Sequence, residues 1–96
     1  MLESAFQAAL IKELKQQFPG CVVLKNDPNY RQGIPDIIVL WKDKWAALEC
    51  KSRKGAHVQP NQQYYIDNLN MLSFARFIYP ENREEVLHDL QQAFQS

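Results

Sequence analysis

The 96-residue sequence has few cysteines, few glycines and no long hydrophobic run. Cys21 and Cys50 are its two cysteines and lie far apart in the chain, so neither a zinc site nor a disulfide framework is expected. The first 20 residues carry charged side chains and no uninterrupted apolar stretch, which argues against a signal peptide or a membrane span. We expect residues 1–96 to form one domain of an intracellular protein, with no membrane contact.

Charge is balanced overall but is distributed unevenly along the chain. Eleven Lys and Arg residues match eleven Asp and Glu residues, so the net charge is zero. Residues 1–54 carry nine basic and six acidic side chains, whereas residues 55–96 carry two and five. A basic patch would suit a phosphate backbone, although an ordinary solvated surface accounts for the same residues. The basic residues near the centre of the chain are Lys42, Lys44, Lys51, Arg53 and Lys54.

Hydrophobic periodicity predicts helices and strands in the order α-β-β-β-α-β-α. Helical spacing indicates a first helix over 2–18, a second that begins at Pro60 and runs to about Leu72, and a third that begins near Asn82. Short β-branched or aromatic runs predict strands over 21–25, 37–41, 45–48 and 74–79. This order predicts an α/β fold with a central mixed sheet flanked by helices.

The two central strands are expected to form a β-hairpin around the polar sequence Lys42-Asp43-Lys44. A two-residue turn would place Asp36 opposite either Glu49 or Lys51, whereas a three-residue turn would point Asp36 away. In both two-residue registers the three charged side chains share one surface. Two facing carboxylates offer the oxygen ligands that a hard divalent cation such as Mg²⁺ prefers. The lysine offers a proton carrier or a positive charge for an anionic transition state.

Each of the first two helices carries one polar residue at the start of its apolar face. In helical projection Glu3 falls among the apolar residues, so we expect it on the core side, where it serves either the helix dipole or a site. Gln62 shares the inner face of the second helix, and its amide bonds either to backbone or to the charged residues of the hairpin. The two apolar faces are expected to comprise Leu2, Phe6, Leu10, Leu14 and Phe18 in the first helix and Tyr65, Ile66, Leu69 and Leu72 in the second.

Three ordered motifs resemble those of a nuclease family. Pro35-Asp36, followed by Glu49-Cys50-Lys51, resembles the PD-(D/E)xK signature of restriction-endonuclease-like nucleases. With Gly33-Ile34 in front and Val58-Gln59-Pro60-Asn61-Gln62 behind, the pattern is similar to the VRR-NUC domain, a small virus-type replication and repair nuclease. Gln59 departs from this pattern, because the family often has Ser there, and the change removes a good helix cap.

The resemblance implies a restriction-endonuclease-like core and an endonuclease that cuts DNA with Mg²⁺ or Mn²⁺. Lys51 would orient or deprotonate the attacking water, and Gln62 would fix Lys51 or a phosphate oxygen. The ligands of the metal would be Asp36, Glu49, the backbone carbonyl of Cys50 and, through a water molecule, Glu3. A helix-1 glutamate belongs to the active site in this family, and Glu3 occupies the matching place.

The expected partners are DNA, branched rather than linear, and a second copy of the chain. Aromatic residues crowd the hairpin turn and the next helix, which predicts a twofold homodimer, although core packing would also account for them. The resemblance places the protein in the cytoplasm of a bacterial or phage-infected cell. The alternative classes are a non-catalytic nucleic-acid-binding module and an assembly subunit of the same fold. The aromatic residues are Trp41, Trp45, Tyr64 and Tyr65, and the expected DNA contacts are Tyr30, Arg31, Arg53 and Lys54.

Overall fold

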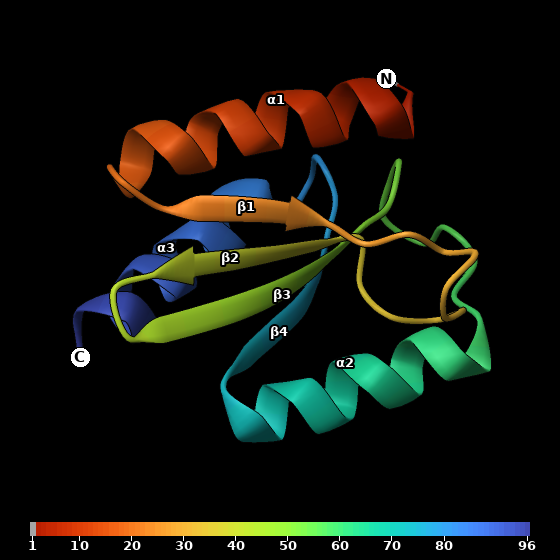
Figure 1. Ribbon diagram of the computed structural model, residues 1–96. Coiled ribbons are helices and arrows are strands. Elements are labelled where there is room, and N and C mark those ends of the chain that lie inside the picture. Colours follow the sequence, from red (N-terminus) through yellow and green to blue (C-terminus); the bar gives the residue numbers. More distant parts are fainter. Residues whose placement is uncertain (1) are drawn as a thin grey trace.

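The computed structural model describes residues 2–96 and places a four-stranded mixed sheet between helices (Figure 1). The strand order is β1-β2-β3-β4, in which β3 and β4 are parallel and the other neighbours are antiparallel. The α/β class and the predicted order of helices and strands are confirmed. The elements are α1 (Glu3–Gln17), β1 (Val22–Lys25), β2 (Ile37–Trp41), β3 (Lys44–Cys50), α2 (Pro60–Leu72), β4 (Phe74–Ile78) and α3 (Arg83–Gln95).

The hairpin of β2 and β3 adopts one of the two predicted registers. Ile37 pairs with Leu48 and Trp41 pairs with Lys44, so the turn consists of two residues, of which Lys42 has a positive φ of 58°. Because Asp36 precedes β2 and Glu49 follows Leu48, this register places the two carboxylates across from each other where β2 begins. The register with Asp36 opposite Lys51 is not adopted.

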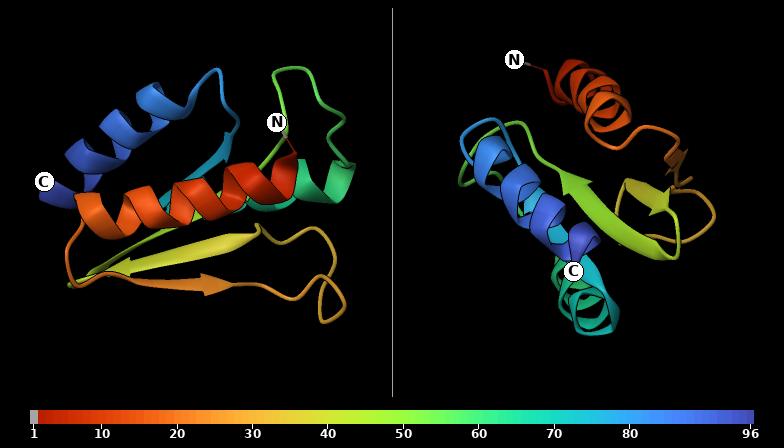
Figure 2. Two further views of the ribbon diagram at one scale, coloured as in Figure 1. Left: turned by 90° about the horizontal axis from the view of Figure 1, so that it is seen from above. Right: turned by 90° about the vertical axis from the view of Figure 1, so that its left-hand side faces the viewer.

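The larger part of the core lies between the sheet and the helices α1 and α3, which lie close together (Figure 2). Gln17 of α1 donates hydrogen bonds to the Leu87 carbonyl and the Gln91 side chain of α3, at 3.1 Å and 2.7 Å. Helix α2 covers the other face, where Ile66 packs with Ala47 and Ala75. Alternation along β3 therefore sends Ala46, Leu48 and Cys50 to the larger core, and Ala47 with its alternate neighbours to the α2 side.

The buried apolar faces of α1 and α2 are shorter than predicted. Phe6, Leu10 and Leu14 are buried as expected, but Leu2 is 76% exposed because it precedes the first turn of α1. Leu72 ends α2 and is 75% exposed, so its predicted place on the inner face is wrong. Within residues 2–96, no helix has both the length and the apolar character needed to cross a bilayer.

The two tryptophans beside the hairpin turn pack on opposite faces of the sheet. The Trp41 ring contacts Phe18 and Phe94, with centroid distances of 5.2 Å and 5.9 Å, and its indole N–H donates to the Pro19 carbonyl at 3.0 Å. Trp45 packs against the smaller cluster around Ile66. Core packing thus accounts for Trp41 and much of Trp45, whereas Tyr64 in α2 is 61% exposed. The homodimer stays a prediction.

Candidate active site at the mouth of the hairpin

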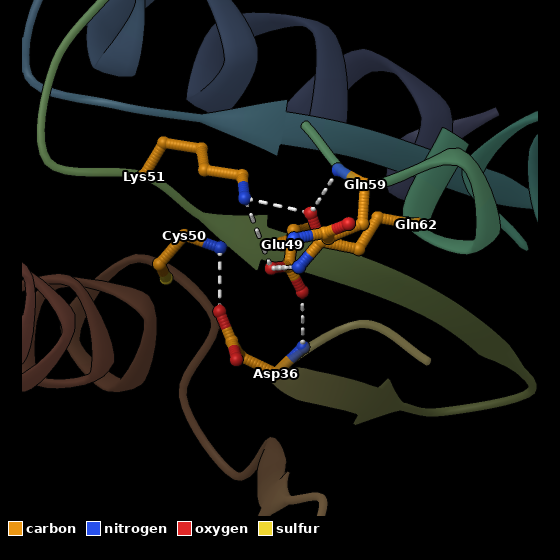
Figure 3. Close-up of polar contacts among 6 residues, drawn as sticks. All are labelled: Asp36, Glu49, Cys50, Lys51, Gln59 and Gln62. Atoms are coloured by element: carbon orange, nitrogen blue, oxygen red, sulfur yellow. Dashed lines mark hydrogen bonds and ion pairs between the residues drawn. The ribbon is translucent and has the colours of Figure 1, made fainter. Parts of the chain in front are cut away.

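Four polar residues from three segments meet where β2 begins and β3 ends (Figure 3). Asp36 directly precedes β2. Glu49 is the second-last residue of β3, and Lys51 is the first residue after β3. Gln62 comes from the first turn of α2 and points at this end of the hairpin. Glu49 and Lys51 lie on the α2 side of the sheet because they continue the alternation of Ala47.

The two carboxylates each bond to the backbone of the opposite strand. The backbone N–H of Cys50 donates to Asp36 Oδ2 at 2.8 Å, and the backbone N–H of Asp36 donates to Glu49 Oε1 at 3.1 Å. Hydrogen bonds between a backbone donor and a carboxylate are among the stronger ones in proteins. This reciprocal pair therefore fixes both acidic side chains relative to the strand ends.

Gln62 joins the lysine to the carboxylate. Its side-chain oxygen accepts from Lys51 Nζ at 2.8 Å and from the backbone N–H of Gln59 at 3.0 Å, while its Nε2 donates to Glu49 Oε2 at 2.9 Å. Lys51 Nζ itself lies 3.8 Å from Glu49 Oε2. Two donors on one side and an acceptor on the other fix the orientation of the amide. Gln62 also satisfies the backbone donor of Gln59, although Gln59 replaces the expected Ser.

Burial changes the protonation of the acidic residues. Glu49 is 5% exposed, and burial, followed by the charge of Asp36, raises the pKa of its carboxyl to about 8. Burial also raises the pKa of Asp36, against the Cys50 N–H bond and the Lys51 charge, which lower it. Burial raises the pKa of the Cys50 thiol to about 12, so this cysteine is no thiolate ligand at neutral pH. Two adjacent buried carboxyls cannot both be ionised cheaply without added positive charge.

The raised pKa of Glu49 predicts that the metal-free protein loses stability as the pH rises. The folded pKa is about 8 against a usual value of 4.5, so between these limits the folded state binds more protons than the unfolded state. The free energy of unfolding should therefore fall as the pH rises from 4.5 to about 8, and it should stay constant above that pH. Glu49→Gln is uncharged and should remove the fall, gaining roughly 1–2 kcal/mol over the wild type between pH 6 and pH 9 after allowance for solvent screening. Urea unfolding in EDTA measures this difference, and parallel pH profiles would contradict it.

The donor set at this site fits a hard divalent cation only in part. Asp36, Glu49 and the Cys50 carbonyl are oxygen donors of the kind that Mg²⁺ prefers. Burial is the main cause of the raised pKa values of the two carboxyls, and the mutual repulsion of Asp36 and Glu49, which adds to the pKa of Glu49, is what a bound cation would relieve. Within residues 2–96, however, no three or more His, Cys, Asp and Glu side chains are grouped so that they could hold a metal ion. The protein would therefore supply two carboxylates and a backbone oxygen.

The predicted place of Glu3 on the core side is wrong, whereas its predicted role as a ligand through a water molecule stays a prediction. Its side chain is exposed in the first turn of α1, next to the exposed Leu2. The Glu3 charge is still near enough to raise the pKa of Glu49. It contributes a negative field to the site, and a direct contact with Asp36 or Glu49 is not part of the structure.

The expected DNA contacts lie on two exposed loops. Tyr30 is 77% exposed, and Arg31 donates from Nη1 to the Tyr65 hydroxyl at 3.4 Å. Arg53 and Lys54 are exposed and follow Lys51 in the loop between β3 and α2. These side chains therefore do not join the carboxylates, but they extend the polar surface on both sides of the hairpin mouth.

Two residues near the site were missed by the sequence analysis. Gln7 lies next to the Cys50 thiol and lowers its pKa by a hydrogen bond, and it follows Glu3 by one helical turn, which was the available signal. Asn26 donates from its backbone N–H to the Asp36 carbonyl at 2.8 Å and from its side chain to the Pro35 carbonyl at 2.5 Å. These two bonds hold the segment that carries Asp36. Asn26 lies beside this segment only because β1 pairs with β2, which could not be read from a local motif.

Gly33 leaves room for the side chain of Asn61 at the start of α2. Its φ is +90°, and a Cβ at this position would lie 2.7 Å from Asn61 Cγ. Gly20 is a matched control, since its φ is +87° and a Cβ there would have no neighbour within 4 Å. Gly33→Ala should therefore cost roughly 1 kcal/mol more than Gly20→Ala in urea unfolding. Equal costs would mean that Asn61 moves aside freely.

Comparisons of this chain with protein-family models, with curated proteins and with solved structures found no match. Function must therefore be inferred from the contacts among Asp36, Glu49, Lys51 and Gln62. The resemblance of their motifs to VRR-NUC nucleases stays a prediction.

Proposed function

We propose that this protein is a Mg²⁺- or Mn²⁺-dependent endonuclease that hydrolyses DNA phosphodiester bonds on a restriction-endonuclease-like core. The observation that carries the proposal is the buried Lys51 ammonium, held 2.8 Å from Gln62 Oε1 and 3.8 Å from Glu49 Oε2, beside two carboxyls of raised pKa. Buried ionised groups are costly, and perturbed pKa values cluster at functional sites. A purely structural position would be filled at lower cost by apolar side chains.

The side chains divide the chemistry of hydrolysis among them. Asp36 and Glu49 would hold the cation together with the Cys50 carbonyl. When bound, the cation would neutralise charge on the scissile phosphate and acidify a water molecule. As the ammonium that donates to Gln62, Lys51 would orient that water, and only as the neutral amine would it accept the proton at Nζ; in either form Gln62 holds Nζ in place.

The substrate is proposed to be DNA, bound through its phosphates by the exposed basic residues around the site. Arg53 and Lys54 stand directly beyond Lys51, and Arg31 lies on the loop before Asp36. Arginine is suited to bidentate phosphate contacts, and the exposed Tyr30 ring is suited to stacking. We further propose that branched DNA is preferred and that the protein acts in the cytoplasm.

A cleavage assay tests the proposal. Purified protein is incubated with linear, flapped and four-way DNA in Mg²⁺, Mn²⁺ or EDTA. Cutting that requires the cation supports the proposal. Tight DNA binding without cutting under any condition would instead identify a non-catalytic nucleic-acid-binding module, and the absence of both would leave an assembly subunit.

We also propose that the protein forms a homodimer, through a surface different from the one predicted. Val22, Leu24 and Leu40 are 50%, 48% and 38% exposed on the adjacent strands β1 and β2, although the neighbouring Ile38 packs against the cluster around Ile66 of α2. Exposed apolar side chains gathered on a sheet face are typical of interfaces. Light scattering should give twice the monomer mass of 11.2 kDa, and Leu24→Glu should restore the monomer. A monomeric wild type would remove this proposal.

A further inference from the structure

A hollow of about 400 Å³ lies directly beside Lys51. Its lining residues come from the loop between β3 and α2, from α2 itself, and from the end of β4 and the residues that follow it. Its volume is within the range of small-ligand sites. Its lining includes Lys51, Arg53, Ala56, Val58, Ile66 and Phe77.

The lining combines apolar surface with positive charge. Ala56, Val58, Ile66 and Phe77 contribute carbon surface, whereas the cations come from Lys51, Arg53 and Arg76. No carboxylate is part of the lining among the residues that the structure describes. A flat heteroaromatic group that carries a phosphate has the matching distribution of apolar surface and negative charge.

The loop between β3 and α2 is held in place. The backbone N–H of Lys54 donates to Glu81 Oε1 at 3.2 Å, and the backbone N–H of Ala56 donates to the Arg53 carbonyl at 3.3 Å. At the far end, Asn82 donates from Nδ2 to the Phe77 carbonyl at 3.1 Å. The walls are thus preorganised, which lowers the cost of binding.

We propose that this hollow receives an unpaired nucleobase of the DNA substrate, next to the phosphate that is cut. The inference rests on the proposed nuclease function and specifies its substrate class. Stacked and paired bases cannot present a free face to the hollow, whereas a base at a flap or junction can leave the helix at low cost. Because Lys51 belongs both to the hollow and to the candidate active site, a base held here places its own phosphate beside the reacting centre.

A double-perturbation cleavage experiment tests this inference. Flapped DNA is prepared with a single abasic residue at each unpaired position near the cut, and wild type is compared with Ala56→Trp, which fills the hollow. We expect one abasic position to lower cutting by the wild type about tenfold, and Ala56→Trp to lower cutting of intact flapped DNA similarly. When the Ala56→Trp variant is given the abasic DNA, its cutting should fall no further than with either change alone. Ala9→Trp, on the exposed surface of α1, is the matched control.

Additive losses, or no abasic position with an effect, would overturn the inference while the nuclease proposal stands. A second measurement does not depend on cutting. NMR titration of the wild type with deoxyadenosine monophosphate should shift the methyl signals of Val58 and Ile66, and deoxyribose 5-phosphate, which has no base, should not. Base-dependent shifts would support the hollow even if no DNA is cut, whereas equal shifts with both probes, or none, would overturn it.

Discussion

Lys51→Ala should lower the rate of DNA cleavage by about 10²–10⁴-fold, the usual contribution of a positioned acid–base group. The variant should keep its affinity for Mg²⁺ or Mn²⁺, because the ammonium lies beside the carboxylates and is not a ligand. Its removal also takes away the charge that lowers the pKa of Glu49, so metal binding should shift to higher pH. Single-turnover cleavage and calorimetric titration with Mn²⁺ at several pH values measure both effects.

Lys12→Ala is the matched control for this variant, since Lys12 is exposed on α1 and the substitution is identical. It should cleave at the wild-type rate. A full rate for Lys51→Ala would show that the lysine has a structural role in holding Gln62. Loss of metal binding in this variant would show that the ammonium organises the carboxylates.

Asp36→Asn should abolish both metal binding and cleavage. An amide has one oxygen and no charge, so the site would keep a single carboxylate, and loss of several kcal/mol of charge stabilisation corresponds to about a thousandfold or more in rate. The fold should persist, because the Asn oxygen can still accept from the Cys50 N–H, which lies 2.8 Å from Asp36 Oδ2. Cation-dependent thermal stabilisation, cleavage and circular dichroism together test this expectation.

Asp43→Asn is the control, because Asp43 is exposed in the turn at the other end of the hairpin. It should keep both the cation-induced rise in melting temperature and the activity. If Asp36→Asn retained that rise, the cation would bind elsewhere and the proposed pair of ligands would be wrong.

Local patterns predicted the hairpin and its charges well. The polar residues Lys42-Asp43-Lys44 between two apolar runs predicted the hairpin but left two-residue and three-residue turns open. The structure has the two-residue turn, which places Asp36 across from Glu49. The choice between two registers could not be made from the sequence, because both place the charges on one surface.

Helical projection was less reliable. It predicts the direction in which a side chain points around the helix axis, but it does not predict whether another element lies there to bury that side chain. In projection Glu3 and Leu72 fall on the apolar faces, yet they are the first residue of α1 and the last residue of α2, and both are exposed. Gln62 lies in a first turn that does face the hairpin, so its predicted approach to the charges is confirmed. Its choice of partners, Lys51 and Glu49 as well as backbone, depends on the approach of α2 to β3, which no local pattern contains.

The contacts of the candidate active site are also local in the chain, which bears on the order of folding. Its side-chain hydrogen bonds join residues only 11 to 14 positions apart, whereas those between α1 and α3 join residues 70 or 74 positions apart. Closing the shorter loops costs about 1.5 kcal/mol less conformational entropy for each closure. Contacts of short sequence separation form faster. The ends of β2 and β3 and the first turn of α2 can therefore associate before the N- and C-terminal helices dock on the opposite face of the sheet.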